Sequence, residues 1–358
     1  MSKKKIAILY GGRSVEHGVS VNSARNICQF IDKKKFKPLL IGITEKGTWY
    51  LTGDVNSRIK KGEKLSLQLT ADKPVFKTKK KSFTPDIVFP VLHGTDGEDG
   101  SIQGLLKAMG LPMIGTGVLG SAMSMNKLIA KKLLKEAGLP VADFLFCFYP
   151  DRQKVKFEDI KKKLGLPFMV KSASLGSSVG VSKVKARRDF KKAIDEGFRY
   201  DDCILFEKYI RGREIECAVL GNADARASLP GEIIINENYE FYTFDAKYVD
   251  GEAVSIKVPA TLTPTISKKI REASLLAFQT LACEDFARVD LFLDENGKIY
   301  VNEINTIPGF TNSSMFPMMW KERGISFKDL ITKLVELAEA RFRLTQRADR
   351  GYSSSLKY

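Results

Sequence analysis

The chain has 358 residues, of which 44% are hydrophobic and 28% charged, a balance that excludes extensive disorder. This length predicts two or three packed units rather than a single core. The first apolar run, 6–10, stops at two glycines and is too short for a signal peptide or a membrane span, so we expect a cytoplasmic protein without a membrane partner.

The net charge of +16 could indicate a nucleic-acid partner. However, the lysine runs 33–35, 79–81 and 161–163 are short, separate and free of interleaved aromatic residues, so we expect solvated surfaces and no nucleic-acid binding. The charge could instead favour anionic substrates. The five cysteines are scattered without a C-x-x-C pair, which favours reduced, buried thiols over disulfides or a zinc site.

Alternating strands and helices over the first 120 residues predict an α/β unit with an open, mostly parallel sheet. The expected elements are strand 6–10, helix 21–31, strand 39–43, strand 87–91 and helix 101–108. We expect Ser101 to cap the last of these helices. We also expect the polar, lysine-rich stretch 56–81 to be rich in loops.

Further along the chain the pattern predicts two more units, of α/β and partly α+β character. The second contains helix 124–137 and strands 141–148, 168–171, 181–184 and 204–207. The third contains strands 214–220, 232–235 and 254–258 and helices 264–281 and 328–342. The predicted domains are therefore 1–121, 122–208 and 209–345, followed by a tail at 346–358.

A hairpin near the end of the third unit carries two acidic residues. The Asn-Gly pair at 296–297 joins two apolar runs and is the strongest short hairpin signal. If these two residues form the loop, the ladder places Asp290 opposite Glu303 and Arg288 opposite Asn305, with all four side chains on one face.

Facing carboxylates repel each other, so a cation should lie between them. Oxygen ligands of this kind suit magnesium, which usually takes one or two carboxylates plus substrate phosphates. The hairpin therefore predicts a site for a magnesium-bound nucleotide. An exposed acidic face neutralised by Arg288 is the alternative.

Two glycine-containing loops follow predicted strands. The first, SASLGSSVGV after Lys171, offers backbone and serine donors to phosphate oxygens, although a plain hairpin turn would also explain it. The second, GGRSVEHGVS, places Glu16 where open sheets bind ligands. Glu16 could hold a ligand ammonium or be an ordinary first-turn acid. His17 is expected to be exposed, whereas His93, in VLHGTDGEDGS, is a functional candidate with a plain loop role as the alternative.

In combination, several strings resemble the D-alanine:D-alanine ligases of the ATP-grasp superfamily. They are GGRSVEHGVS, LHGTDGEDGSIQG, LGSSVGVSKV, FEKYIRGREIECAVLGN, YTFDAKY, ARVDLF and VNEINTIPGFTNSSMFP, and they follow the family's order from about residue 6 to residue 337. The resemblance implies a three-domain ATP-grasp architecture that uses ATP with two Mg²⁺ ions, or Mn²⁺. It also implies that two D-alanines are joined through a D-alanyl phosphate, for peptidoglycan precursors, by a protein that is commonly a homodimer through its N-terminal domain.

The resemblance also implies the nucleotide and metal ligands. The metal ligands would be Asp290, Glu303 and Asn305, which agrees with the hairpin register. The residues implied for ATP are Lys127, Lys171 and Lys247 at the phosphates, Glu207, Lys208 and the Ile210 backbone at adenine, Glu214 at the ribose, and Ser178, Asn302 and Glu303. The segment 237–257 resembles the loop that closes over ATP.

The amino-acid site is implied in the same way. Glu16 would hold the ammonium of the first D-alanine in a hydrogen-bonded triad with Ser177 and Tyr248. Donors to the tetrahedral oxyanion would be Arg288 and the Gly309 amide. The carboxylate of the second D-alanine would be bound by Ser314 and the Met315 amide. His93 is expected among the substrate-binding residues.

Departures from the family pattern occur at Gly18, Asn126 and Ser172, and none removes a named ligand. Two alternatives stay open. One is a ligase whose second substrate is D-lactate or D-serine, although Tyr248 argues against D-lactate. The other is a catalytically silent protein that binds a nucleotide or a nucleic acid.

Overall fold

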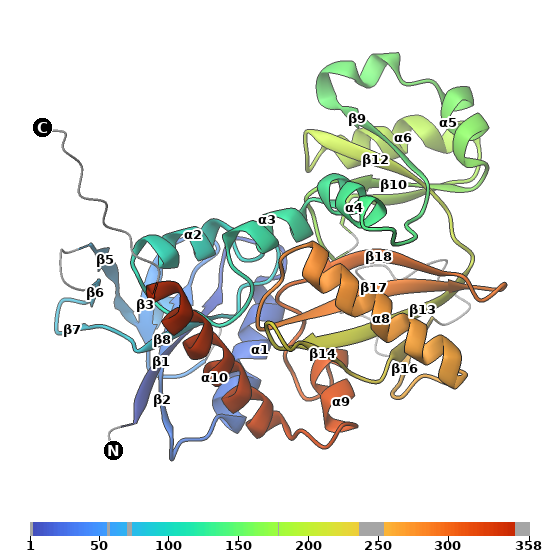
Figure 1. Cartoon of the computed structure of the whole chain (residues 1–358). Coiled ribbons are helices and arrows are strands. Elements are labelled where there is room, and N and C mark those ends of the chain that lie inside the picture. The colour runs from blue at the N-terminus through green and yellow to red at the C-terminus, as the bar shows by residue number, and fades with distance from the viewer. Residues whose placement is uncertain (1–2, 56–57, 70–73, 178, 236–253, 348–358) are drawn as a thin grey trace, which may run out of the picture.

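The computed structural model describes residues 3–55, 58–69, 74–177, 179–235 and 254–347. Over these residues the strands form four sheets with helices packed against them (Figure 1). Three predicted site residues lie outside the described residues: Ser178, Lys247 and Tyr248. Most of the predicted closing loop, 237–257, lies outside them as well. Among the helices that are described, none is both long and apolar enough to cross a membrane.

The first sheet is built around a strand that is buried along most of its length. β1 (Lys4–Gly11) lies between β2 (Phe36–Ile43) and β8 (Ile87–Pro90) and is parallel to both, which confirms the predicted parallel arrangement. On the β2 side, β3 (Trp49–Thr52) and β4 (Glu63–Lys64) continue the sheet in antiparallel fashion, so the whole sheet is mixed. Burial of both faces explains why β1 is an unbroken apolar run.

Helices follow two of the parallel strands at their carboxyl ends, where open α/β sheets bind ligands. They are α1 (His17–Phe30) after β1 and α2 (Ser101–Ala108) after β8. The predicted cap of α2 is wrong. The N-cap residue is Gly100, whose φ of 95° suits glycine, and the Ser101 amide donates to the Asp99 carboxylate at 2.9 Å.

The stretch 56–81 is more regular than predicted. Besides β4, its described part contains the short helix η1 (Ile59–Lys61) and the strands β5 (Ser66–Gln68) and β6 (Val75–Lys77), and β7 (Ser82–Phe83) completes a small antiparallel sheet. Phe76 of β6 is fully buried and stacks on Phe83. Strands of two or three residues are too short to leave a clear periodic pattern, which explains the wrong prediction.

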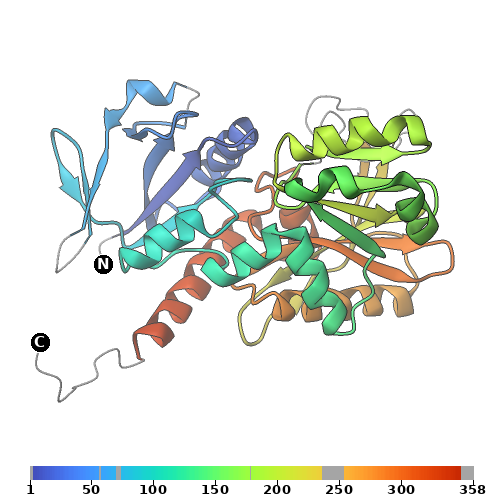
Figure 2. The same cartoon turned by 90° about the horizontal axis from the view of Figure 1, so that it is seen from above.

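The helix predicted over 124–137 is two helices. α3 (Val118–Met125) ends at Asn126, and α4 (Lys127–Glu136) begins at the next residue. The Asn126 side chain accepts a hydrogen bond from the Ile129 amide, which satisfies one of the free donors at the start of α4. The break between α3 and α4 lies where the chain passes from the first sheet to the second (Figures 1 and 2).

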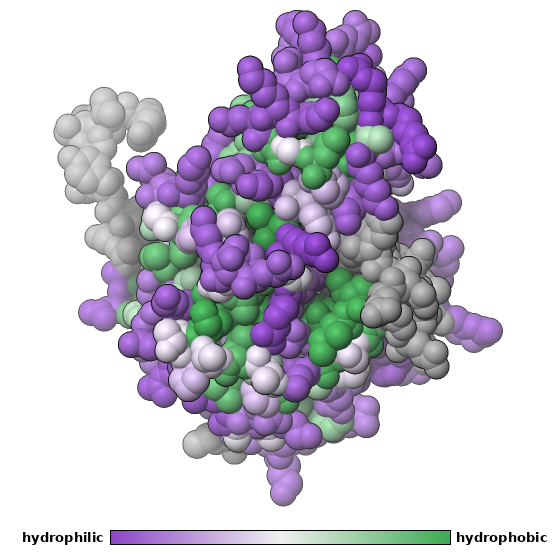
Figure 3. All heavy atoms as spheres, turned by 90° about the vertical axis from the view of Figure 1, so that its right-hand side faces the viewer, coloured by the Kyte–Doolittle hydropathy of each residue, from purple (hydrophilic) through white to green (hydrophobic). Residues whose placement is uncertain are grey.

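The second sheet is antiparallel in the order β11-β10-β12-β9. Its strands are β9 (Phe144–Phe148), β10 (Phe168–Ser172), β11 (Val181–Val184) and β12 (Cys203–Lys208). The sequence did not predict its helices, η2 (Tyr149–Lys154), α5 (Phe157–Leu164) and α6 (Arg187–Phe198). Mostly hydrophilic side chains cover the molecule where α5 and α6 lie (Figure 3). The lysines of runs 33–35, 79–81 and 161–163 are all exposed, as expected.

The third sheet has the order β16-β15-β13-β17-β18, with β14 (Arg226–Ala227) paired to β13. The other strands are β13 (Gly212–Leu220), β15 (Gly231–Ile235), β16 (Val254–Lys257), β17 (Phe286–Asp294) and β18 (Ile299–Asn305). The predicted helices are present as α8 (Pro264–Thr280) and α10 (Phe327–Gln346), and the short α9 (Met315–Lys321) was not predicted.

One hydrophobic core joins the first sheet to the third. It contains residues of β1, α1 and β8 together with residues of β13, α9 and α10, and ring contacts link Phe89 to both Phe286 and Phe310. Separate cores lie under α8 and between the second sheet and α5 and α6. The cysteines are free, and four of the five are buried: Cys147, Cys203, Cys217 and Cys283.

Candidate active site

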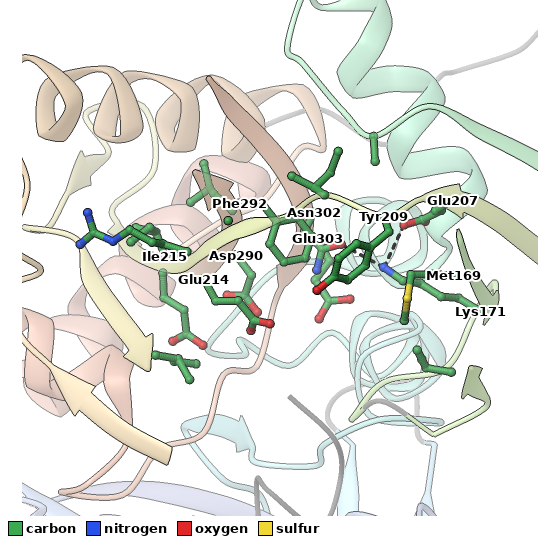
Figure 4. Close-up of a pocket in the computed structure, with 18 of the residues that line it drawn as sticks. Met169, Lys171, Glu207, Tyr209, Glu214, Ile215, Asp290, Phe292, Asn302 and Glu303 are labelled. Atoms are coloured by element: carbon green, nitrogen blue, oxygen red, sulfur yellow. Dashed lines mark hydrogen bonds and ion pairs between the residues drawn. The ribbon is translucent and has the colours of Figure 1, made fainter. Parts of the chain in front are cut away.

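A cleft of about 390 Å³ lies between the second and third sheets (Figure 4). The predicted ATP and metal residues that line it are Lys127, Lys171, Glu207, Lys208, Ile210, Glu214, Asp290, Asn302 and Glu303. They come from α4, β10, β12, β13, β17 and β18, together with the segment between β12 and β13. The fold therefore brings residues that are far apart in the sequence together around one cleft.

The phase of the strands decides which apolar residues face the cleft. Met169 and Lys171 line it, whereas Val170 between them is fully buried in the core of the second sheet. Phe292 lines the cleft too, while Phe206 belongs to that core. Successive side chains of a strand point to opposite faces of the sheet. If Lys171 faces the cleft, Val170 must therefore face the core.

Glu207 is a buried carboxylate between two lysines. Its Oε2 lies 2.8 Å from Lys171 Nζ, and its Oε1 lies 3.3 Å from Lys131 Nζ. Burial by itself would raise the pKa of Glu207, but the two ammonium groups reverse this and lower the pKa to about 2. For Lys171, burial works to lower the pKa, but the Glu207 carboxylate outweighs it, so the pKa is raised. Both groups are therefore charged at neutral pH.

The acidic hairpin has the predicted register at its functional end. Asp290 pairs with Glu303 and Arg288 pairs with Asn305. The Arg288 guanidinium donates to both carboxylate oxygens of Asp290 at 2.7 Å, and the Asn305 amide donates to the same carboxylate at 2.9 Å. Glu303 lies 3.8 Å from the ammonium of Lys127. Each of the two acids thus has a cation beside it.

The turn of the hairpin differs from the prediction. Leu293 pairs with Ile299, so the loop has three residues, 295–297, and only Gly297 among them has a positive φ, 77°. A β-bulge restores the predicted pairing further along, because Leu291 pairs with Val301 while Asp290 pairs with Glu303. The extra residue is Asn302.

This bulge brings one more ligand into the cleft. Val301 and Ile304 are buried in the core, and both residues between them, Asn302 and Glu303, line the cleft. In a regular strand two successive side chains would point to opposite faces. As a result, the side-chain oxygen Oδ1 of Asn302 accepts a hydrogen bond from the Lys171 ammonium at 3.2 Å.

The residues present fit a hard divalent cation. Asp290, Glu303 and Asn305 offer only oxygen ligands and lie together on one face, which is the donor chemistry that magnesium prefers. The part of the chain that is described contains no group of three His, Cys, Asp or Glu residues suited to a metal. This result does not conflict with the predicted set, because one of its three members is an asparagine.

The loop before α1 reaches the glycine loop of the second unit. Glu16 is buried, and the Ser177 hydroxyl donates a hydrogen bond to its carboxylate. Gly176, the neighbour of Ser177, lines the cleft between the second and third sheets. The residue Gly94 packs so closely that a Cβ there would lie 2.6 Å from the Glu16 carboxylate. Glu16 therefore links the end of the first sheet to the glycine loop.

His93 is buried at the carboxyl end of β8. Its Nδ1 lies 2.8 Å from the Ile307 carbonyl, and its Nε2 lies 3.0 Å from the Ser23 hydroxyl. Burial lowers the pKa of His93, so the imidazole is neutral, with Nδ1 donating and Nε2 accepting. The other histidine, His17, is half-buried rather than exposed, and its Nδ1 lies 2.7 Å from the Gly12 carbonyl.

The remaining predicted residues follow β18. Gly309 packs against Ser314, where a Cβ would lie 3.1 Å from the Ser314 hydroxyl. Ser314 precedes α9, and its hydroxyl accepts from the Thr311 amide. Met315 is buried at the first position of α9. These residues do not line the cleft described above. They belong to the segment after β18, which contacts His93 through the Ile307 carbonyl.

Sequence reasoning missed three charged residues around the site. Lys131 lies four positions after Lys127, and Glu216 lies two positions after Glu214, so helix and strand periodicity could have identified both. The Glu216 carboxylate lies 3.0 Å from the Arg288 guanidinium. The third, Glu98, is bridged to the segment after β18 through the Ile307 amide, a contact that no local pattern predicts.

Comparison with known proteins gives a family. A model of the D-ala D-ala ligase N-terminus matches residues 5–116, and one of the D-ala D-ala ligase C-terminus matches residues 133–336. A D-alanine–D-alanine ligase A of Chromobacterium violaceum is 44% identical over 365 residues, covering 98% of this chain and 99% of that protein. A D-alanine–D-alanine ligase of Shouchella clausii is 44% identical over 352 residues, covering 94% and 95%.

Solved structures agree with this result. The D-alanine-D-alanine ligase from Coxiella burnetii has a TM-score of 0.87 at 38% identity and covers 97% of both chains. The VanG D-Ala:D-Ser ligase from Enterococcus faecalis has a TM-score of 0.84 at 33% identity, covering 94% of this chain and all of that one. The mixed α/β ATP-grasp fold expected from the sequence is thereby confirmed. On these matches, the chain belongs to the D-alanine:D-alanine ligase family.

Proposed function

We propose that this protein joins two D-alanine molecules at the expense of ATP, giving D-alanyl-D-alanine, ADP and phosphate for peptidoglycan precursors. The observation that carries the proposal is the single cleft into which the fold brings two lysines and the acidic hairpin, with Glu16 and Ser177 at its glycine loop. A cationic and metal-binding end beside a buried carboxylate suits phosphoryl transfer to an amino-acid substrate.

In the proposed complex, the cleft holds ATP with its base beside Glu207. The Glu207 carboxylate and the backbone at Lys208 and Ile210 receive adenine, and Glu214 accepts hydrogen bonds from the ribose hydroxyls. Lys127 and Lys171, whose ammonium groups already lie beside Glu303 and Asn302, neutralise the phosphates. The remaining phosphate contacts proposed from the sequence, Ser178 and Lys247, lie outside the described residues.

Mg²⁺ or Mn²⁺ held by Asp290, Glu303 and Asn305 would supply charge neutralisation at the phosphates when bound. The protein side chains would orient the substrates and stabilise the charges that develop during the reaction. The carboxylate oxygen of the first D-alanine attacks the γ-phosphorus, and the bond to the β-phosphate oxygen breaks, which releases ADP and leaves a D-alanyl phosphate.

The second step forms the peptide bond. The amine of the second D-alanine attacks the carbonyl carbon of the acyl phosphate, and phosphate leaves with the electrons of the broken C–O bond. Glu16 with Ser177 orients the first ammonium, and Arg288 with the Gly309 amide stabilises the oxyanion. The triad member Tyr248 belongs to this proposal but is outside the described residues. Ser314 and the Met315 amide would hold the carboxylate of the second D-alanine, and His93 would be a further substrate-binding residue.

Measurement of ADP release with and without D-alanine, with the product identified by mass spectrometry, tests the function. We expect release only when D-alanine and Mg²⁺ are both present, with D-alanyl-D-alanine as the product. Parallel reactions with D-alanine plus D-lactate or D-serine decide the second substrate, since the similar VanG structure is that of a D-Ala:D-Ser ligase. A preferred mixed product would refute the D-alanine assignment, and salt-sensitive nucleic-acid binding without turnover would refute the whole proposal.

We also propose that the chain is divided into three units, 1–121, 122–208 and 209–345. This division is supported by the separate sheet that each unit contains. The proposal also includes a cytoplasmic location, where ATP is available, and a homodimer as the resemblance implies. Light scattering of the purified protein tests the oligomeric state.

A further inference from the structure

Lys131 is a buried lysine to which the proposed reaction gives no role. It lies on α4 one turn after Lys127, and 1% of its side chain is exposed. Among the described residues, Glu207 is the one carboxylate within 4.0 Å of its ammonium nitrogen. A buried ammonium group is costly unless an anion compensates for it, so its place in the structure depends on Glu207.

The two oxygens of Glu207 have separate cations. Lys171 lies beside Oε2, and Lys131 lies beside Oε1. Rotation of the carboxylate would break at least one of these contacts. In addition, a proton on either oxygen would have to replace an ammonium contact. The carboxylate is thus held in one orientation and in its ionised form.

The two lysines are not equivalent. Lys171 also donates to the Asn302 side chain at 3.2 Å and lines the nucleotide cleft, where the proposed function has it bind phosphate. Its ammonium is therefore shared between Glu207 and other partners. Lys131 does not line the cleft, and among the described residues its one ion-pair partner is Glu207, so it can hold the carboxylate whatever Lys171 does.

An ionised carboxylate distinguishes purines at position 6. The 6-amino group of adenine donates a hydrogen bond to it, whereas the 6-oxo group of hypoxanthine or guanine presents lone pairs and is repelled. A protonated carboxyl group could donate to the oxo group and would lose this discrimination. This discrimination depends on the adenine contact that Glu207 makes in the proposed function.

We propose that Lys131 is a positioning residue for nucleotide specificity: it fixes Glu207 as an anionic acceptor, so that the site selects a 6-amino purine nucleotide over a 6-oxo one. Lys131 acts through Glu207 and touches no substrate.

The test is Lys131→Met, which keeps the length of the side chain and removes its charge. ATP and ITP are compared, because their bases differ only on the edge at position 6: adenine has an amino group and an accepting N1, whereas hypoxanthine has an oxo group and an N1–H. We expect the ratio of kcat/KM for ATP to that for ITP to fall about tenfold, mainly through a higher KM for ATP, with kcat at saturating ATP within about threefold of the wild-type value. Lys135→Met, an exposed lysine one turn further along α4, should leave the ratio unchanged.

A double-mutant cycle separates this role from general destabilisation. In a Glu207→Gln background, Lys131→Met should change the ratio no further, because the group through which it acts is gone. An unchanged ratio in the single variant, or an equal fall in both backgrounds, overturns the proposal. Should Lys131→Met not fold, the double variant is compared with Glu207→Gln alone, and unequal ratios in these two proteins overturn it.

Calorimetric binding of ATP and ITP without D-alanine keeps this inference separate from the ligase reaction. If the wild-type protein prefers ATP but releases no ADP with D-alanine, the proposed function fails and the role of Lys131 stands. If the wild-type protein binds ATP and ITP equally, the inference fails, whatever the protein ligates.

Discussion

Asp290 and Glu303 face each other across two neighbouring strands, an arrangement that repulsion disfavours. The structure offsets this repulsion separately for each acid. Asp290 accepts two hydrogen bonds from the Arg288 guanidinium, and Glu303 lies beside the Lys127 ammonium. Because Lys127 belongs to a helix far away in the sequence, the charge balance of the hairpin depends on how the second and third units pack.

At Glu303 the ionic role can be separated from the structural one. Glu303→Gln keeps the size of the side chain but removes its charge. We expect ADP release to fall by about 100-fold or more, since a proposed metal ligand is weakened and Lys127 loses its anionic partner. The fold should stay intact because Glu303 is partly exposed. Steady-state assays and circular dichroism measure the two effects. Glu295→Gln, in the exposed loop of the same hairpin, is the control, and near-normal activity of Glu303→Gln would refute the metal assignment.

Glu98 gives the protein a pH-dependent stability. Its carboxylate accepts hydrogen bonds from the Gly94 and Ile307 amides, but burial, followed by the nearby Glu16 carboxylate, raises the pKa of Glu98 to about 8. An unfolded glutamate has a pKa near 4.5. Between these values the folded state holds one proton more than the unfolded state, so its stability falls as pH rises.

We therefore expect Glu98 to lower the free energy of unfolding by about 1.4 kcal/mol per pH unit between pH 5 and pH 8. Glu98→Gln cannot release the proton, so its unfolding free energy should depend less on pH over this range. Urea unfolding of both proteins at several pH values provides the measurement. Parallel curves for the two proteins would contradict the assignment to Glu98.

Helix α4 illustrates how one element presents two cations. Its first residue, Lys127, and Lys131 one turn later lie on the same face, and both point to acids of the active site. The start of the helix is fixed by the Asn126 cap, whose amide group also donates to the Ser174 hydroxyl at 3.1 Å. A single polar residue thus sets where the helix begins and where Lys127 lies.

Removal of this cap should be measurable. We expect Asn126→Ala to lower the free energy of unfolding by about 1 kcal/mol, because the Ile129 amide loses its acceptor. Asn126→Asp keeps an acceptor at the cap and should retain most of the stability. Denaturant titration of the three proteins compares them, and equal midpoints for the alanine variant and the wild type would show that the cap contributes nothing.

At the level of the hairpin, two departures from the predicted geometry cancel. The loop has one residue more than predicted, which shifts the pairing next to the turn, and the bulge at Asn302 shifts it back before Asp290. The functional pairs are therefore as predicted although the turn is not. Gly297 is visible in the sequence as a turn residue, but a bulge in β18 has no local signature here, since it results from packing on both sides of the strand.

For the molecule as a whole, Arg341 connects three parts of the chain. From α10 its guanidinium donates to the carbonyls of Met113 and Gly115 and binds the carboxylates of Glu284 and Asp285. Asp285 is fully buried directly before β17, the strand that carries Arg288 and Asp290. This cluster holds the C-terminal helix, the first unit and the catalytic sheet together.

We expect Arg341→Met to destabilise the protein by about 3 to 5 kcal/mol, because it leaves the Asp285 carboxylate buried without its main counter-ion. The control is Arg343→Met, an exposed arginine on the same helix, which should change stability by less than about 0.5 kcal/mol. Thermal unfolding measures both. Similar losses for the two variants would mean that the cluster has no special role.

The sequence by itself determined the elements with strong periodicity, such as β1 and α8, and the presence of the hairpin that carries Asp290 and Glu303, because side-chain alternation and local turn signals are properties of short segments. The pairing of the two acids also depends on the bulge at Asn302, which packing decides. Segments of weak periodicity, such as β5 to β7, were decided only by the contacts of the folded chain. Tertiary structure alone revealed the contacts of Lys131 and Lys171 with Glu207, the contact of Glu98 with Ile307 and the Arg341 cluster. These join residues from distant parts of the chain, and burial sets their charge states, so no local pattern contains them.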